Sequence, residues 1–96
     1  MAKDDVIYQE VWPLGHISHL KLTSQAFMAS IYKLFIPLAT IPVTAIRHVE
    51  ISRLELNKVM AISYYKTPNT FTTATFSIDD MEAWYHAFIS VGITVD

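Results

Sequence analysis

The stretch Thr70-Phe-Thr-Thr-Ala-Thr-Phe76, followed directly by Ser77-Ile-Asp-Asp80, decides the fold expected for this chain. The first part is rich in Thr and Phe, as strands are. The second part has the composition of a helix start. Ser77 can accept a hydrogen bond from the backbone N–H near Asp80, and acidic side chains favour the positive end of the helix dipole. The sequence therefore predicts a strand that runs straight into a helix.

An apolar stripe follows this helix start. Met81, Trp84, Tyr85 and Phe88 recur at i, i+3, i+4 and i+7, which is the spacing of one face of an amphipathic helix. Gly92 then supplies a left-handed stop, and the isoleucine after it is placed to fold back on the last turn. We interpret the stripe as core contact between the helix and a sheet rather than as a recognition surface.

The rest of the chain supplies the sheet that this helix must cover. Short segments rich in β-branched and aromatic residues, bounded by Pro, Gly, Asn and Ser, are typical of strands joined by turns. They predict about seven strands and one C-terminal helix, an α+β fold with the helix packed on an antiparallel sheet. The expected strands cover residues 6–12, 16–22, 26–30, 31–38, 49–51, 58–65 and 70–76. We also expect a helical turn over residues 42–46, a turn at Asn57, and a β-turn over residues 66–69.

The length and composition suit a single domain over residues 1–96, with residues 1–5 and the last residues expected to be loose. Hydrophobic residues make up 52% of the chain and charged residues only 17%, so the apolar surplus must lie in a core, a partner or a membrane. The net charge of -2 argues against nucleic acid as a partner. The absence of cysteine excludes disulfides.

The sequence does not indicate export or membrane insertion. The start, Met1-Ala-Lys-Asp-Asp5, is charged and mixed in sign, unlike a signal peptide. Residues 22–46 are mostly apolar, but Lys33, Pro37 and Pro42 interrupt them, whereas a span needs about twenty unbroken apolar residues. We therefore expect a cytoplasmic protein.

The sequence contains no arrangement typical of catalysis or of metal binding. Its two glycines are far apart and cannot form a Gly-rich phosphate loop. Asp79 and Asp80 stand at a helix start, where capping accounts for both. His16 and His19 are three residues apart, so on a strand they face opposite sides. We expect no enzyme activity, no metal and no cofactor.

Three short motifs and the end of the chain resemble one family. The motifs are Leu20-Lys-Leu-Thr23, Phe35-Ile-Pro-Leu38 and Ile46-Arg-His-Val49. They are similar, in the same order, to motifs of bacterial pleckstrin-homology-like domains of the PH and GRAM type, which also close with a tryptophan-bearing helix, here at Trp84. The resemblance covers residues 15–95. It implies a bent antiparallel sheet that forms a partly open barrel and is capped by the C-terminal helix.

The same resemblance bears on function. Members of that family bind phosphoinositides, peptides or other proteins, or serve as assembly modules. Those that bind phosphoinositides carry Lys and Arg around the loop between the first two strands. Here that loop, Pro13-Leu-Gly-His16, has no permanent cation. This departure ranks protein binding above lipid binding, and a fold alone does not fix a function.

We expect a non-enzymatic binding or assembly module. It would act by protein–protein interaction or self-association, through an exposed sheet edge or an aromatic patch. The candidate interaction residues are Trp12, Tyr64 and Tyr65. Alternation places residues 59, 61, 63 and 65 on one face and residues 60, 62 and 64 on the other, so at least one of the two tyrosines lies off the core face.

The alternative hypothesis is a peripheral membrane module that reads anionic lipid headgroups weakly. Its candidate residues are Arg47, Arg53 and Lys58, which folding would have to gather near one rim. The remaining cations are spread along the chain, as ordinary solvated charges are. A small enzyme of unknown type ranks third, because the side-chain constellations that catalysis requires are missing from the sequence.

Overall fold

The computed structural model describes residues 6–11, 19–31 and 36–96, and they form an α+β fold of seven antiparallel strands and one C-terminal helix. This is the predicted fold class. The elements, in chain order, are β1 (Val6–Val11), β2 (His19–Thr23), β3 (Ala26–Ile31), β4 (Ile36–Pro42), the 3-10 turn η1 (Val43–Ala45), β5 (Ile46–Leu54), β6 (Asn57–Thr67), β7 (Thr70–Ser77) and α1 (Met81–Ser90).

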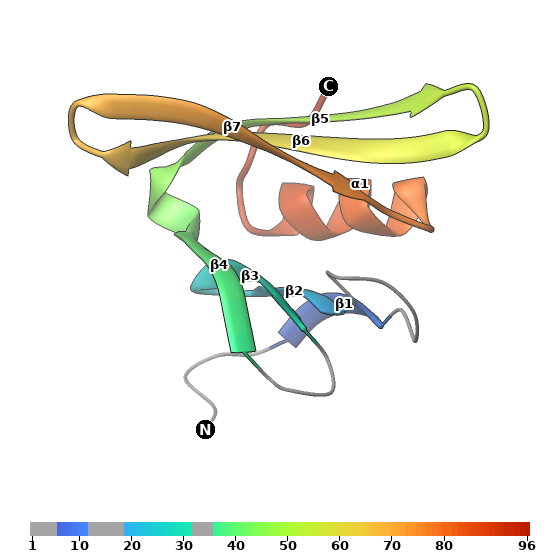
Figure 1. The fold of residues 1–96 in the computed structure, drawn as a ribbon, viewed down its shortest axis with the longest axis horizontal. Helices are drawn as coiled ribbons and strands as arrows, with labels where there is room; N and C mark the ends of the chain where they lie inside the picture. The colour runs from blue at the N-terminus through green and yellow to red at the C-terminus, as the bar shows by residue number, and fades with distance from the viewer. Residues whose placement is uncertain (1–5, 12–18, 32–35) are drawn as a thin grey trace.

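The strands form two sheets in simple sequential order. One sheet has the order β1-β2-β3-β4 and the other has the order β5-β6-β7, with every neighbouring pair antiparallel. Figure 1 shows the two sheets as separate layers with α1 between them. No strand pair joins the two sheets in the part of the chain that the structure describes, so these strands do not close into a barrel.

Several strands begin or end at other residues than the sequence predicted, and the differences are largest for β4 and β5. β4 contains Pro37 and continues to Pro42, where the sequence predicted a break after a strand over residues 31–38. Both prolines are tolerated because β4 is the edge strand of its sheet, where a missing N–H need not break the ladder. β5 is longer than predicted, because its pairing with β6 begins at Ile46 and runs to Leu54. The predicted helical turn between them is present as η1.

The two hairpins of the second sheet have different turns. The predicted turn before β7 is confirmed, with Pro68 and Asn69 in the turn and the Asn69 N–H donating to the Thr67 hydroxyl at 3.3 Å. The turn predicted at Asn57 is formed by the two residues before it, Glu55 and Leu56, and Asn57 is the first residue of β6. Glu55 takes the left-handed conformation that this tight turn requires, with φ of 58°.

The core lies between the two sheets, around the aromatic residues of α1. The Trp84 ring contacts Tyr8 edge-on at 4.8 Å between centroids and Phe27 at 5.8 Å, and Phe88 is also fully buried. The stripe is therefore core, as predicted, with one exception. Tyr85 is 42% exposed, since the buried face of the helix is a narrow one made by Trp84, Ala87 and Phe88.

The N-terminus of α1 is not capped as the sequence predicted. Ser77 is the last residue of β7, and the cap is Asp80, whose carboxylate accepts a hydrogen bond from the Ala83 N–H at 3.0 Å. The residues before the helix donate instead to Glu10 on β1. The Asp79 N–H lies 3.0 and 3.1 Å from the two Glu10 oxygens, and the Asp80 N–H lies 2.9 Å from one of them.

Glu10 therefore attaches the first sheet to the loop that precedes the helix. Its side chain is buried, and the Tyr8 hydroxyl donates to the same carboxylate at 3.4 Å. Burial and the negative charge of Glu10 raise the pKa of Tyr8 to about 12. Glu10 and Asp79 are 69 residues apart in the sequence. No local sequence pattern indicates a contact over that separation, and it was not predicted.

The C-terminal end of α1 stops as predicted. Gly92 has φ of 85°, its N–H donates to the Ile89 carbonyl at 2.9 Å, and the Ile93 N–H donates to the Phe88 carbonyl at 3.1 Å. These two bonds form the usual glycine-stop motif, and Ile93 is buried against the core.

The last residues were expected to be loose, but they are hydrogen-bonded to β5. The Val49 N–H donates to Thr94, the Asp96 N–H donates back to Val49, and the Ile51 N–H donates to Asp96. The segment runs parallel to β5 at the bridge between Val49 and Val95. It therefore covers part of the outer edge of this sheet.

Candidate interaction surface

An exposed pair of aromatic side chains lies at the hairpin end of β6 and β7. Tyr65 and Phe71 are cross-strand partners, 40% and 54% exposed, with ring centroids 4.9 Å apart. Tyr65 is one of the predicted candidates, whereas Phe71 was not recognised. A plain two-residue hairpin register would place Phe71 opposite Lys66, but the ladder shifts between Tyr65 and Thr67 and brings Tyr65 opposite Phe71.

A cation lies over the Tyr65 ring of this pair. The Arg47 guanidinium sits 5.4 Å from the Tyr65 ring centroid, within cation–π range, and donates to the Thr44 carbonyl at 3.4 Å. Arg47 and Tyr65 also line a groove of about 540 Å³, whose walls include a second cation, Lys66. Its lining residues are Thr44, Ala45, Arg47, Tyr65, Lys66, Thr67 and Pro68. No carboxylate is among them, so the groove is electropositive. We call Arg47, Tyr65, Lys66 and Phe71 the aromatic–cationic site.

The other two predicted cations lie at the opposite end of the sheet. Arg53 and Lys58 are cross-strand partners near the β5–β6 turn, and Arg53 is six residues along β5 from Arg47. At the usual rise of a strand, this separates the two arginines by roughly 20 Å. The structure therefore brings Arg53 and Lys58 together but does not gather all three candidates near one rim.

The surroundings of Arg53 and Lys58 are acidic. The Lys58 ammonium donates to the Asp79 backbone carbonyl at 2.9 Å. The cleft beside it, about 520 Å³, is lined by Arg53, Lys58, Asp79, Asp80, Met81 and Glu82. These carboxylates offset the two cations, which makes the cleft a poor place for a lipid phosphate. The second sheet thus has a cationic end at Arg47 and Lys66 and a predominantly acidic end at the start of α1.

The two remaining aromatic candidates are placed differently. Tyr64 is half-buried and packs against the core from the inner face of the sheet, together with the buried Met60 and Ile62. This is the alternation that the sequence predicted, and it leaves Tyr65 as the exposed tyrosine. Trp12 lies outside the described residues.

Exposed leucines at the β5–β6 turn were not predicted. Leu54 is 62% exposed and Leu56, in the turn itself, is 96% exposed. A side chain in a two-residue turn projects beyond the sheet and cannot pack on its inner face. The pairing register of β5 and β6 places Leu56 in this turn and therefore leaves it exposed. The sequence did not indicate their exposure, because the turn was expected at Asn57 and not at Glu55 and Leu56.

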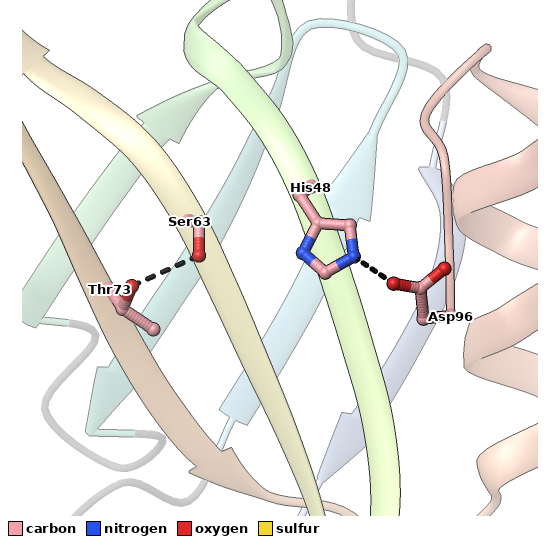
Figure 2. Close-up of polar contacts among 4 residues, drawn as sticks. All are labelled: His48, Ser63, Thr73 and Asp96. Atoms are coloured by element: carbon pink, nitrogen blue, oxygen red, sulfur yellow. Dashed lines mark hydrogen bonds and ion pairs between the residues drawn. The ribbon is translucent and has the colours of Figure 1, made fainter.

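A polar row crosses the outer face of the second sheet. Figure 2 shows the His48 ring bonded through Nε2 to the Asp96 carboxylate, and the Ser63 hydroxyl bonded to the Thr73 hydroxyl at 3.0 Å. His48 on β5, Ser63 on β6 and Asp96 of the C-terminal segment are side chains of the kinds used in nucleophilic catalysis, which needs a hydrogen bond between the serine and the histidine. Here the Ser63 hydroxyl is bonded to the Thr73 hydroxyl, and the His48 ring is bonded to Asp96.

The histidines do not converge on a metal in the part of the chain that the structure describes. No group of three or more His, Cys, Asp or Glu residues there could hold a metal ion. His19 contacts the Gln9 side chain at 2.9 Å. Burial and, secondarily, the charge of Lys21 lower the pKa of His19. His16 lies outside the described residues.

No helix in the described part of the chain is long and apolar enough to cross a membrane. Among the described residues, α1 is too short to cross a bilayer, and no other α-helix occurs.

Comparisons of the chain with protein-family models, with curated proteins and with solved structures found no match.

Proposed function

We propose that this chain is a non-enzymatic protein-binding module and that the aromatic–cationic site is its binding surface. The observation that carries the proposal is the exposed pair of Tyr65 and Phe71, whose rings are in tilted contact, with the Arg47 guanidinium over the Tyr65 ring. Tyr, Phe and Arg are side chains enriched at protein interfaces, and Tyr and Arg are common among the residues that contribute most of the binding energy.

The surroundings of the pair favour a protein partner. The groove beside Tyr65 offers apolar atoms from Ala45 and Pro68 as well as the cation Lys66. A partner with an acidic residue next to an apolar one would complement both features. An open groove on a sheet surface differs from the enclosed, convergent pocket that small-molecule catalysis requires.

We also propose that the fold is pleckstrin-homology-like. Two antiparallel sheets, of four and of three strands, with a C-terminal helix between them support this proposal. So does the buried tryptophan of that helix, which corresponds to the one in the sequence resemblance.

The test is affinity capture with two matched double variants. Tyr65→Ser with Phe71→Ser removes the exposed aromatic pair, whereas Tyr85→Ser with Ile89→Ser removes two comparably exposed residues from α1. Quantitative mass spectrometry of proteins captured from cells that express the chain should show partners lost with the first variant and retained with the second. Equal capture by both variants would refute the proposed surface.

Binding to an anionic membrane is the second candidate, because Arg47 and Lys66 line a groove without a carboxylate. Co-sedimentation with anionic and neutral vesicles separates the two functions. Salt-sensitive binding to anionic vesicles alone, lost in Arg47→Glu with Lys66→Glu but not in Arg53→Glu with Lys58→Glu, would establish the membrane function. Failure of the wild-type chain to sediment with either vesicle would remove it.

A further inference from the structure

The described strands leave four sheet edges, and three of them carry features that oppose pairing with another chain. β1 carries the inward-pointing charge of Glu10, and β4 contains Pro37 and Pro42. The edge of β5 is partly covered by the C-terminal segment at Val49–Ile51. Buried charges, prolines and covering segments are the usual protections of exposed edges.

β7 has none of these protections. Its sequence, TFTTATFS, contains no charged residue and no proline over its whole length. It pairs with β6 on one side, and no other described strand pairs with it on the other side. Alternate backbone N–H and C=O groups of an edge strand point outward, so β7 offers a ladder to an incoming strand.

The charges at the two ends of β7 are opposite. Lys66 and Arg47 lie at the hairpin end, where β7 begins at Thr70. Asp79 follows shortly after β7 ends at Ser77, in the cleft where the three carboxylates of Asp79, Asp80 and Glu82 outnumber the two cations, Arg53 and Lys58. An identical strand that approaches antiparallel to β7 therefore places the cationic end of one chain beside the acidic end of the other, at both ends of the contact.

From this complementarity we infer that the partner is a second copy of this chain, paired edge to edge through β7 about a two-fold axis. The inference rests on the proposed protein-binding function and names its partner. The product is a continuous six-stranded sheet, with an isologous contact in which each ionic pair occurs twice. A parallel approach would instead bring like charges together.

The side-chain pattern restricts the register. The outer faces of the two copies become continuous only if residues that face outward pair with one another. A pairing centred on Ala74 meets this condition, because it sets Thr73 opposite the partner's Thr75. It also sets Phe71 opposite the partner's Ser77, which lines one cleft together with the exposed Leu56 in each copy. Phe71 and Leu56 are thereby covered by the same contact.

This register places the ionic groups within reach. The partner's Asp79 lies two strand spacings, roughly 10 Å, from the Lys66 backbone, a gap that a lysine and an aspartate side chain span together. Because the contact is ionic at the rim, the dimer should weaken as salt rises.

The experiment is a charge swap followed by sedimentation-velocity centrifugation over a range of micromolar concentrations. The wild-type chain should dimerise. Lys66→Glu and Asp79→Lys, each altering two contacts per dimer, should each raise the dissociation constant about tenfold. The double variant Lys66→Glu with Asp79→Lys should restore dimerisation toward the wild-type value, and the control Lys21→Glu, on the first sheet, should leave it unchanged.

Circular dichroism establishes that each variant is folded, and Glu82→Lys replaces Asp79→Lys if the latter is not. A monomeric wild-type chain would overturn the inference, as would a dimer unaffected by the single reversals or not restored by the double variant. The proposed function is tested separately by the Tyr65 and Phe71 double variant. If that variant still loses a heterologous partner while the chain is a monomer, the protein-binding function stands and the second copy does not.

Discussion

The Glu10 carboxylate makes the contact whose loss should be most informative about stability. It is 8% exposed and accepts hydrogen bonds from the N–H groups of Asp79 and Asp80, so it attaches β1 to the start of α1. A hydrogen bond to a charged group contributes about 1.5–3 kcal/mol net. Glu10→Ala removes the acceptor of two such N–H groups, which would lower the free energy of unfolding by up to about 6 kcal/mol.

Water reduces this loss, because Asp79 and Asp80 are themselves exposed and their N–H groups can be partly rehydrated once the carboxylate is gone. We therefore expect Glu10→Ala to lower the free energy of unfolding by about 2–4 kcal/mol, a large share of the total of about 5–15 kcal/mol typical of a domain. Glu10→Gln keeps the shape and an acceptor oxygen and should lose about half as much.

Urea unfolding followed by far-ultraviolet circular dichroism measures these differences. Glu50→Ala, an exposed acidic residue on β5, is the control and should change the free energy of unfolding by less than about 0.5 kcal/mol. A loss below about 1 kcal/mol in Glu10→Ala, or an equal loss in Glu50→Ala, would refute the assignment of Glu10 as the link between β1 and α1.

Three further predictions concern the ends of α1 and the half-buried Tyr8. Asp80→Ala should lower the free energy of unfolding by about 1 kcal/mol because it removes the N-cap, whereas Ser77→Ala should cost almost nothing, and equal losses in urea unfolding would contradict the observed cap. Gly92→Ala should cost about 1–2 kcal/mol from the positive φ alone, since the added methyl meets no atom within 4 Å; an unchanged midpoint of thermal unfolding would contradict this. The pKa of Tyr8 is raised from 10.0 to about 12 in the folded chain, so the unfolded chain loses the phenol proton at lower pH. The contribution of Tyr8 to the free energy of unfolding is therefore complete below pH 10 and is lost between about pH 10 and 12. Tyr8→Phe should flatten the decline of stability over that range, and an identical decline in both proteins would show that Tyr8 does not contribute.

Local features of the fold followed directly from the sequence. The strand before α1, the apolar stripe with Trp84 and the stop at Gly92 each depend on neighbouring residues, so periodicity and glycine conformation were sufficient to predict them. The capping residue was misjudged because Ser77 and Asp80 both suit an N-cap, and the choice depends on where β7 ends. That end is determined by pairing with β6 and by Glu10, neither of which is local.

The candidate site could be predicted only in part, for the same reason. Alternation correctly indicated that one of two adjacent tyrosines is exposed, and the structure identifies it as Tyr65. The ring of Phe71 lies against it only because the ladder shifts near the turn, and Arg47 joins them from a different strand. Register shifts and contacts between distant strands depend on the packing of the whole sheet, so no window of sequence reveals them.

The central claim, that the aromatic–cationic site binds protein, is tested most directly by photo-crosslinking in living cells. Benzoylphenylalanine replaces Phe71 in one strain and Tyr85, a comparably exposed aromatic residue of α1, in another. We expect light-dependent adducts with a discrete protein from position 71, and far less adduct from position 85. An adduct containing two copies of this chain would additionally support pairing through β7. Adduct yields that are no higher from position 71 than from position 85 would contradict the proposed binding surface.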